Sequence, residues 1–148
     1  MGYDVSDFNS DVQQQIKAKM RGIRVTREPQ TLVIGEIAPG LNGKDGLLRE
    51  HWKKRGDRVQ KYANWIAARR PAKAASPVRI IYTRYSVHRM DPDNAAASFK
   101  CWGDALVQAG VLDDDSPDII QDFTVRSRRC SEYRKQRTEI TIEPLTNQ

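Results

Sequence analysis

Four stretches of the chain show the hydrophobic pattern of β-strands. The first is expected over Thr31–Ile37, and the second, Val78–Met90, is apolar on both faces at its start, as central strands are. The third is expected over Ile119–Arg129. The fourth, Arg137–Glu143, alternates between Ile or Thr on one face and mainly charged positions on the other, which predicts one buried face.

Between the strands, two stretches have the period of amphipathic helices. The first is predicted from about Leu47 to Ala68, with an apolar side made of Leu48, Trp52, Val59, Tyr62 and Ile66. The second is predicted over Asn94–Ala109, and Gly110 is a natural stop for it. Its core stripe comprises Phe99, Trp102, Leu106 and Ala109. The order βαβαββ predicts an α+β fold with a small mixed sheet and two main helices.

The length of 148 residues suits a single domain, which we place at residues 31–148. Residues 1–30 precede it as an arm, in which Ser10 is expected to cap a short helix. We expect this arm to pack onto the domain or onto a second subunit rather than to take part in catalysis.

Composition favours a soluble protein of a reducing compartment. No apolar run approaches the roughly 18 residues of a membrane span, and the first residues lack the pattern of a signal peptide. Cys101 and Cys130 are the only cysteines and have no zinc-ligand spacing. We therefore expect a cytoplasmic protein without a membrane partner.

Charge is segregated along the chain, which has a net charge of +6. Eight of the 19 acidic residues lie between Asp91 and Asp122, whereas residues 49–90 contain 12 Lys or Arg against only Glu50 and Asp57. Clustered carboxylates suit a hard divalent cation such as Mg²⁺, and a basic surround suits a phosphate backbone. The two together indicate metal-assisted cleavage of nucleic acid.

The acidic stretch opens with Asp91-Pro92-Asp93-Asn94. Taken alone, this sequence favours helix capping, because an Asp before a Pro at N1 satisfies a free backbone N–H. Its position after a strand, with Asp113, Asp114 and Asp115 about 20 residues later, favours a metal site instead.

The Asp91-x-Asp93-Asn94 motif is followed by Asp104-Ala-Leu-x-x-Ala-Gly110 and then by Asp114-Asp115, and this combination resembles the RusA family of Holliday-junction resolvases. The resemblance implies a dimeric Mg²⁺-dependent endonuclease of phage or prophage origin, with Asp91, Asp93 and Asp115 as catalytic metal ligands and Asp114, beside Asp115, as a further metal ligand. Mn²⁺ is an alternative ion. The family lysine four residues after the second aspartate is absent, because this position is Ala97.

Lys100 is the only basic residue on the second helix, seven residues after Asp93 and so on nearly the same face. Helical side chains lean toward the N-terminus, so its ammonium is a candidate catalytic group near Asp93, with a solvated surface lysine as the alternative. The helix spans about 24 Å, and the five residues after Gly110 return at most about 17 Å. Asp115 therefore reaches Asp93 only if the loop doubles back or if a second subunit supplies it.

Basic side chains form several groups that predict salt-sensitive contacts to DNA phosphates. An ordinary solvated charge is the alternative for any single one, and the few aromatic residues, including Trp52, Trp65 and Trp102, are expected in the core rather than on a base-stacking surface. His88, three residues before Asp91, is expected to be an ordinary residue at a strand end, with a place lining the DNA groove as the alternative. The predicted DNA contacts are Lys53, Lys54, Arg58, Arg69, Arg70, Arg84, Arg89, Arg126, Arg128 and Arg129.

The sequence thus predicts a hydrolase that cleaves four-way DNA junctions in recombination and repair, acting as a homodimer in a bacterial host. A catalytically silent DNA-binding accessory protein of a phage, for packaging or replication, is the first alternative, and the missing lysine at Ala97 favours it. The second alternative is a structural protein whose aspartates only cap helices and whose basic face binds RNA or an acidic partner.

Overall fold

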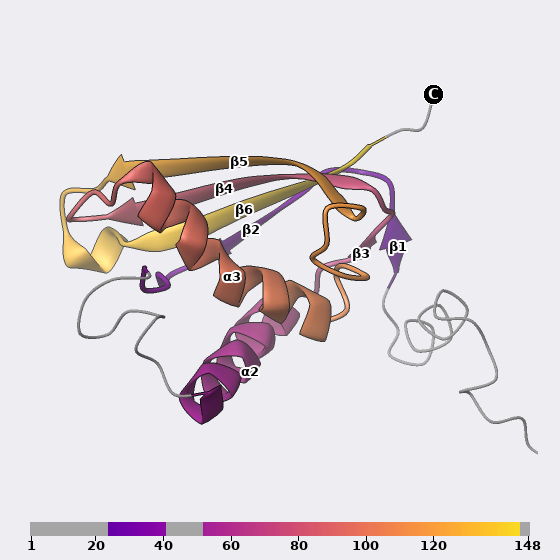
Figure 1. The fold of residues 1–148 in the computed structure, drawn as a ribbon, viewed down its shortest axis with the longest axis horizontal. Helices are drawn as coiled ribbons and strands as arrows, with labels where there is room; N and C mark the ends of the chain where they lie inside the picture. Colours follow the sequence, from indigo (N-terminus) through magenta and orange to yellow (C-terminus); the bar gives the residue numbers. More distant parts are fainter. Residues whose placement is uncertain (1–23, 41–51, 146–148) are drawn as a thin grey trace, which may run out of the picture.

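The expected strands form one mixed sheet with both helices on one of its faces (Figure 1). The computed structural model describes residues 24–40 and 52–145. The strand order is β2-β6-β4-β5, and β4 and β5 are parallel while the other pairs are antiparallel. The strands are β2 (Gln30–Ile34), β4 (Val78–Ser86), β5 (Ile120–Arg129) and β6 (Arg137–Pro144). The α+β class and the mixed sheet predicted from the sequence are confirmed.

Strand β4 is central, as its apolar start predicted, because it pairs with β6 on one side and with β5 on the other. Two predicted strand ends are wrong: β2 stops at Ile34 and β4 at Ser86. The three or four residues beyond each end instead form the turns that lead to the helices. The strict alternation of β6 is confirmed, since Thr138, Ile140 and Ile142 are buried on one face.

Helix α2 (Trp52–Ala68) packs against α3 (Pro92–Gln108). The start of α3 is capped as its sequence predicted: Asp91 Oδ1 accepts the Asn94 N–H at 2.9 Å, and Pro92 occupies the first position. At its other end, Gly110 has a φ of 81° and donates to the Val107 carbonyl, while Val111 donates to Leu106. These two bonds form a Schellman motif, which turns the chain sharply at the end of the helix.

The core lies between the inner face of the sheet and the two helices. Trp102 is fully buried and its ring stacks on Tyr62 of α2 with centroids 4.2 Å apart. Tyr82 of β4 is also fully buried, and its hydroxyl lies 2.7 Å from Ser98 Oγ on α3. The predicted core stripe of α3 is confirmed, because Phe99, Trp102 and Leu106 are buried and Ala109 packs against the core. Trp65 is partly buried against the same core.

A second, two-stranded sheet was not predicted. Strand β1 (Val25–Thr26) pairs in parallel with β3 (Lys73–Ala74), so the last residues of the predicted arm pack onto the domain. The helix expected near Ser10, the first residues of the predicted first helix and the Trp52 side chain lie outside the described residues. In the described part of the chain, no helix is long and apolar enough to cross a membrane.

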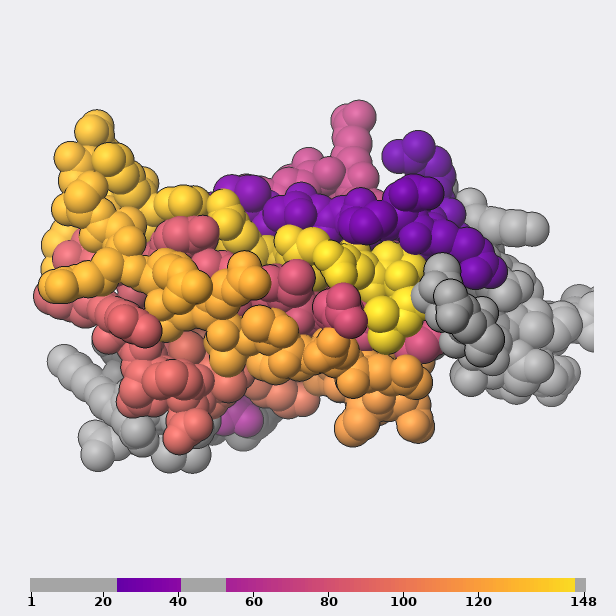
Figure 2. Space-filling view, turned by 90° about the horizontal axis from the view of Figure 1, so that it is seen from above, coloured from indigo at the N-terminus to yellow at the C-terminus, as the bar shows by residue number. Residues whose placement is uncertain are grey.

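The face of the sheet opposite the helices is seen in Figure 2, where strands β2, β6, β4 and β5 lie side by side. The connection from β5 to β6, which contains the 3-10 helix η3 (Tyr133–Lys135), projects at one end of this face in gold. This is the end of the sheet where β4 runs into the start of α3 (Figure 1). The tertiary structure therefore brings the basic β5–β6 connection close to the Asp91-Pro92-Asp93 turn.

Candidate functional site

The Asp91-Pro92-Asp93 turn, which we call the carboxylate turn, joins the end of β4 to α3 and is exposed to solvent. Its capping role is confirmed for Asp91, and the bond to Asn94 uses one of the two oxygens of that carboxylate. Asp93 lies in the first turn of α3, where its negative charge is favoured by the helix dipole. The turn thus presents two carboxylates at one end of the helix.

The contacts of Arg84 and of Gly40 hold the segments next to this turn in place. Arg84 is buried, and it donates from Nε to the Ala38 carbonyl at 3.3 Å and from a terminal nitrogen to Ser86 Oγ at 2.8 Å. Gly40 lies so close to α3 that a Cβ atom there would be 2.2 Å from Asn94 Oδ1. The segment after β2 is therefore fixed against the first turn of α3.

Arg84 was predicted to contact DNA, and its position argues against that role. Burial lowers the pKa of its guanidinium, since desolvation disfavours the charged form. A side chain that is only 6% exposed and bonded to Ala38 and Ser86 holds two segments of the fold together. This role was missed at the level of the sequence, because an arginine is ordinarily a solvent-exposed side chain.

Asp115 lies beside the middle of α3, in a cluster with Lys100 and Asp104. The Lys100 ammonium is 3.0 Å from Asp115 Oδ2 and 3.1 Å from Asp104 Oδ1. A Cβ atom on Gly103 would be 3.6 Å from Asp115 Oδ2. Asp115 thus packs directly against the helix at a residue without a side chain.

The three charges of this cluster shift one another's proton affinities. The hydrogen bond from Lys100 lowers the pKa of Asp115, and the bonds to Asp115 and Asp104 raise the pKa of Lys100. Burial raises the pKa of Asp104, and this effect exceeds the attraction of Lys100. One ammonium therefore serves two carboxylates, of which Asp115 holds its charge more firmly.

Lys100 does not point as predicted. Its ammonium binds Asp104, which follows it by four residues, so the side chain extends toward the C-terminal end of α3 and not back toward Asp93. The physical reason is the pair of carboxylates that the tertiary structure places there, because two ion pairs outweigh the weak N-terminal lean of helical side chains. Lys100 does contact a predicted site residue, but that residue is Asp115.

The loop after α3 doubles back within the same chain, as one of the two alternatives required. It returns along the helix as far as Lys100 and Gly103, which leaves about 10 Å of helix between this point and Asp93. Within residues 24–40 and 52–145, no three His, Cys, Asp or Glu side chains are grouped closely enough to hold a metal ion. The predicted ligands are therefore in two places: Asp91 and Asp93 at the start of α3, and Asp115 near its middle.

The other two aspartates of the triplet have different surroundings. Asp113 is 2.6 Å from the Lys73 ammonium and accepts a bond from Ser76 Oγ at 3.3 Å, so it ties the loop to β3. Asp114 is exposed and accepts the Asp115 N–H at 2.8 Å, which shapes the backbone next to Asp115. Asp114 thus lies next to the cluster, and its predicted place among the metal ligands stays a prediction.

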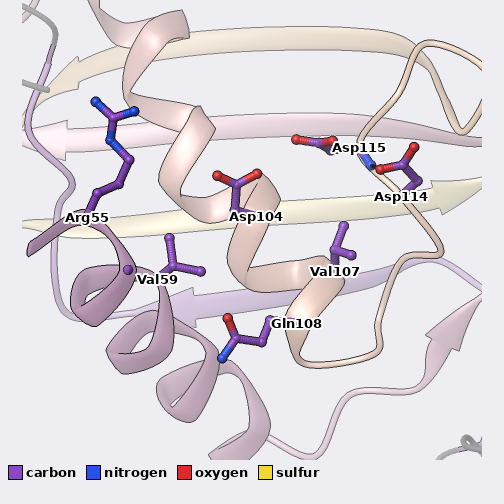
Figure 3. A pocket seen from close by; sticks show the side chains of 8 residues that line it. Arg55, Val59, Asp104, Val107, Gln108, Asp114 and Asp115 are labelled. Atoms are coloured by element: carbon purple, nitrogen blue, oxygen red, sulfur yellow. Dashed lines mark hydrogen bonds between the residues drawn. The ribbon is translucent and has the colours of Figure 1, made fainter. Parts of the chain in front are cut away.

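Two pockets flank the cluster and share Asp115. The first, of about 410 Å³, lies between α2, α3 and the aspartate loop, and Figure 3 shows Arg55 and Val59 of α2 facing Asp104 and Asp115 across it. The second, of about 430 Å³, lies between α3 and β5. Its lining residues are Ala96, Ala97, Phe99, Lys100, Gly103, Asp115, Pro117, Ile120 and Phe123. Ala97, where the family lysine is missing, therefore lines the same pocket as Lys100 and Asp115.

The remaining predicted DNA contacts divide into three surfaces. Lys53, Lys54 and Arg58 lie on α2. Arg69 and Arg70 follow that helix, and Arg69 anchors it by donating to the carbonyls of Val33 and Trp65 at 2.6 and 2.7 Å. The third surface comprises Arg89, Arg126, Arg128 and Arg129, which are all exposed. We call it, together with residues 130–137, the basic hairpin, a name for the turn of the chain at η3 only, because β5 and β6 do not pair and β4 lies between them.

The basic hairpin is attached to the residues that lead into Asp91. Cys130 N–H donates to the Ser86 carbonyl at 3.0 Å, Val87 N–H to Gln136 Oε1 at 3.1 Å, and Met90 N–H to Ser127 Oγ at 3.1 Å. His88, expected to be an ordinary strand-end residue, lies 3.2 Å from the Tyr133 hydroxyl. The hairpin and the carboxylate turn thus form one continuous surface.

Sequence reasoning missed two residues of these surfaces. Asp104 was part of the motif but received no role, although it shares Lys100 with Asp115. Tyr133 was grouped with aromatic residues expected in the core, yet it is 67% exposed. Its neighbours Arg129, Arg134 and Lys135 were the available signal, because core aromatics are rarely surrounded by so many charges.

Models of protein families and curated proteins give no match to this chain.

Proposed function

We propose that this protein is a Mg²⁺-dependent endonuclease that cleaves branched DNA, with four-way junctions as its substrate. The observation that carries this proposal is the folding of Asp115 back onto α3, beside Lys100 and in the pocket that Ala97 lines. Ala97, the position of the family lysine, and Lys100, the lysine that this helix has, thus line one pocket with Asp115, the third predicted carboxylate.

The three predicted carboxylates are chemically suited to Mg²⁺, but in this structure they do not lie close enough together to bind one ion. Carboxylate oxygens are the ligands that Mg²⁺ prefers, and Asp91, Asp93 and Asp115 supply them. In the described arrangement Asp115 is paired with Lys100 about 10 Å along the helix from Asp93. For all three to share one ion, the Lys100–Asp115 pair must open and the loop must shift toward the start of α3, or a second subunit must supply the third ligand.

The basic hairpin supports DNA as the substrate. Between residues 126 and 137 there are six Lys or Arg and one Glu, and contacts to Ser86, Val87 and Met90 hold this segment beside the carboxylate turn. Phosphate contacts of this kind orient a duplex without reading its sequence. A homodimer, with two such surfaces related by symmetry, suits paired incisions across a junction.

The test is cleavage of a synthetic four-way junction and of a linear duplex of the same sequence, in Mg²⁺ and in EDTA. We expect symmetric nicks in the junction alone and only with the metal. Asp118→Asn is the matched control, because Asp118 is an exposed aspartate of the same loop outside the proposed set. Metal-independent cutting, or equal cutting of junction and duplex, would contradict the proposal.

A catalytically silent DNA-binding accessory protein is the second candidate. The ion pair of Lys100 with Asp115 favours it, since this pair neutralises a carboxylate that an active metal site needs. Tight junction binding without cutting in Mg²⁺ or Mn²⁺ would support it. Sedimentation of the protein with and without a junction tests the proposed dimer for both candidates.

A further inference from the structure

Tyr133 is the most exposed large aromatic or aliphatic side chain of the described residues. Tyr133 is 67% exposed, whereas Trp102, Tyr82 and Tyr62 are buried. It occupies the first position of η3, at the tip of the basic hairpin. An exposed aromatic ring in a basic segment is the combination from which proteins build stacking contacts with unpaired bases.

The surroundings of Tyr133 fix its position relative to the carboxylate turn. Its hydroxyl lies 3.2 Å from His88 Nε2, and the two rings meet edge to face with centroids 6.3 Å apart. His88 precedes Asp91 by three residues, so their Cα atoms are at most about 11 Å apart. Tyr133 is thus held at the edge of the surface where the proposed enzyme acts.

The charges around the ring complement a nucleic acid strand. Arg134 and Lys135 follow it directly in η3, Arg129 ends β5 four residues before it, and all three are exposed; Glu132, which pairs with Arg134, is the one acidic residue from 126 to 137. Phosphates that flank a base on the ring would meet these cations. A double-stranded region offers no base face to Tyr133, because its bases are stacked on one another.

We propose that Tyr133 stacks on an unpaired base at the branch point of DNA, so that the basic hairpin recognises single-stranded or branched DNA in preference to duplex. This inference rests on the proposed function for its substrate and deepens it. It adds a binding residue that distinguishes the branch point from the linear arms of the same molecule.

The test measures dissociation constants by fluorescence anisotropy in EDTA, with a labelled single strand, a linear duplex and a four-way junction. Tyr133→Ala is expected to weaken binding to the single strand and the junction about 5- to 100-fold, with the duplex unchanged. Tyr133→Phe keeps the ring and loses the contact with His88, and it is expected to bind like the wild type. Arg129→Gln is the control for charge: it should weaken all three complexes alike and reduce the salt dependence by about one phosphate contact.

The inference is overturned if Tyr133→Ala binds all three DNAs like the wild type, if it weakens them equally, or if Tyr133→Phe is as weak as Tyr133→Ala. Because Tyr133 is exposed, we expect its variants to fold like the wild type, and thermal unfolding of each variant checks this. Because EDTA prevents metal-dependent cutting, the binding test stands apart from catalysis. If the protein shows the expected binding pattern but does not cut DNA, this inference stands and the proposed endonuclease activity is wrong. If the protein cuts junctions but the Tyr133 variants bind like the wild type, only the proposed endonuclease activity stands.

Discussion

The start and the middle of helix α3 hold their aspartates in different ways. At the start, Asp91 and Asp93 are exposed, and the helix itself compensates their charge through a capping bond and its dipole. In the middle, Asp104 and Asp115 are partly buried and share the Lys100 ammonium. The difference shows that aspartates close together in a motif lie in two separate environments, one exposed and without an ion pair among the described residues, and one in which two carboxylates share the ammonium of Lys100.

The largest expected effect comes from the exposed pair. Asp93→Asn should slow junction cleavage by about 1000-fold or more, as removal of a major electrostatic group at a reacting centre does, while binding to the junction stays the same or tightens. Gel assays of cutting in Mg²⁺ and of binding in EDTA measure the two effects, with Asp118→Asn as the control. Normal cutting by Asp93→Asn would place the active site elsewhere.

The two carboxylates that share Lys100 should respond differently. Lys100→Met removes the cation that competes for Asp115, so we expect half-maximal cutting at a lower Mg²⁺ concentration but a maximal rate reduced about 10- to 100-fold, as for partners of a ligating group. Adding Ala97→Lys in the same variant returns an ammonium to the same pocket and should restore much of the rate. A Mg²⁺ titration of cutting rate tests both variants. Wild-type behaviour of Lys100→Met would reduce Lys100 to a surface ion pair.

Gly40, beside the start of α3, and Gly103, in its middle, differ in how much room they leave for a Cβ atom. Gly40→Ala places a Cβ atom 2.2 Å from Asn94 Oδ1, so the Asn94 amide must move aside, and we expect a loss of about 1 kcal/mol in unfolding free energy, at the low end for overpacking. Gly103→Ala meets only Phe99 at 3.4 Å and Asp115 at 3.6 Å, and it should stabilise α3 by about 0.5–1 kcal/mol, because Ala is the better helix former. Urea unfolding compares them. Equal effects would mean that the start of α3 is no more tightly packed than its middle.

The smallest effect is the titration of the two carboxylates that share Lys100. The lowered pKa of Asp115 means that its pairing stabilises the fold above the unfolded value of about 3.9, and that this stabilisation is lost as the pH falls through the lower folded value. The raised pKa of Asp104 acts in the opposite sense, because its ionisation costs stability as the pH rises through the folded value.

Carboxyl carbon NMR measures both titrations. In Lys100→Met we expect the pKa of Asp115 to rise, since its main stabilising partner is gone, while that of Asp104 stays above its usual value because burial causes the shift. An unchanged Asp115 would show that the Lys100 contact does not persist in solution.

The sequence by itself determined the elements, because their signals are local. The alternation of Arg137–Glu143, the apolar stripe of Phe99, Trp102 and Leu106, the cap at Asp91 and the stop at Gly110 each depend on residues within a few positions of one another. The same is true of the two charged stretches. The RusA-like motif, with the activity and ligands it implies, remains a prediction from the sequence.

Only the tertiary structure decided which distant residues meet. The path of the loop after Gly110, the direction of Lys100, the burial of Arg84 and the pairing of β1 with β3 all depend on contacts between residues far apart in the chain. No local pattern encodes them, since a lysine or an arginine has the same propensities whether its partner is solvent or a polar group from another segment. The physical reason is that ion pairs and packing override the weak local preferences of single side chains once the core has fixed where the segments lie.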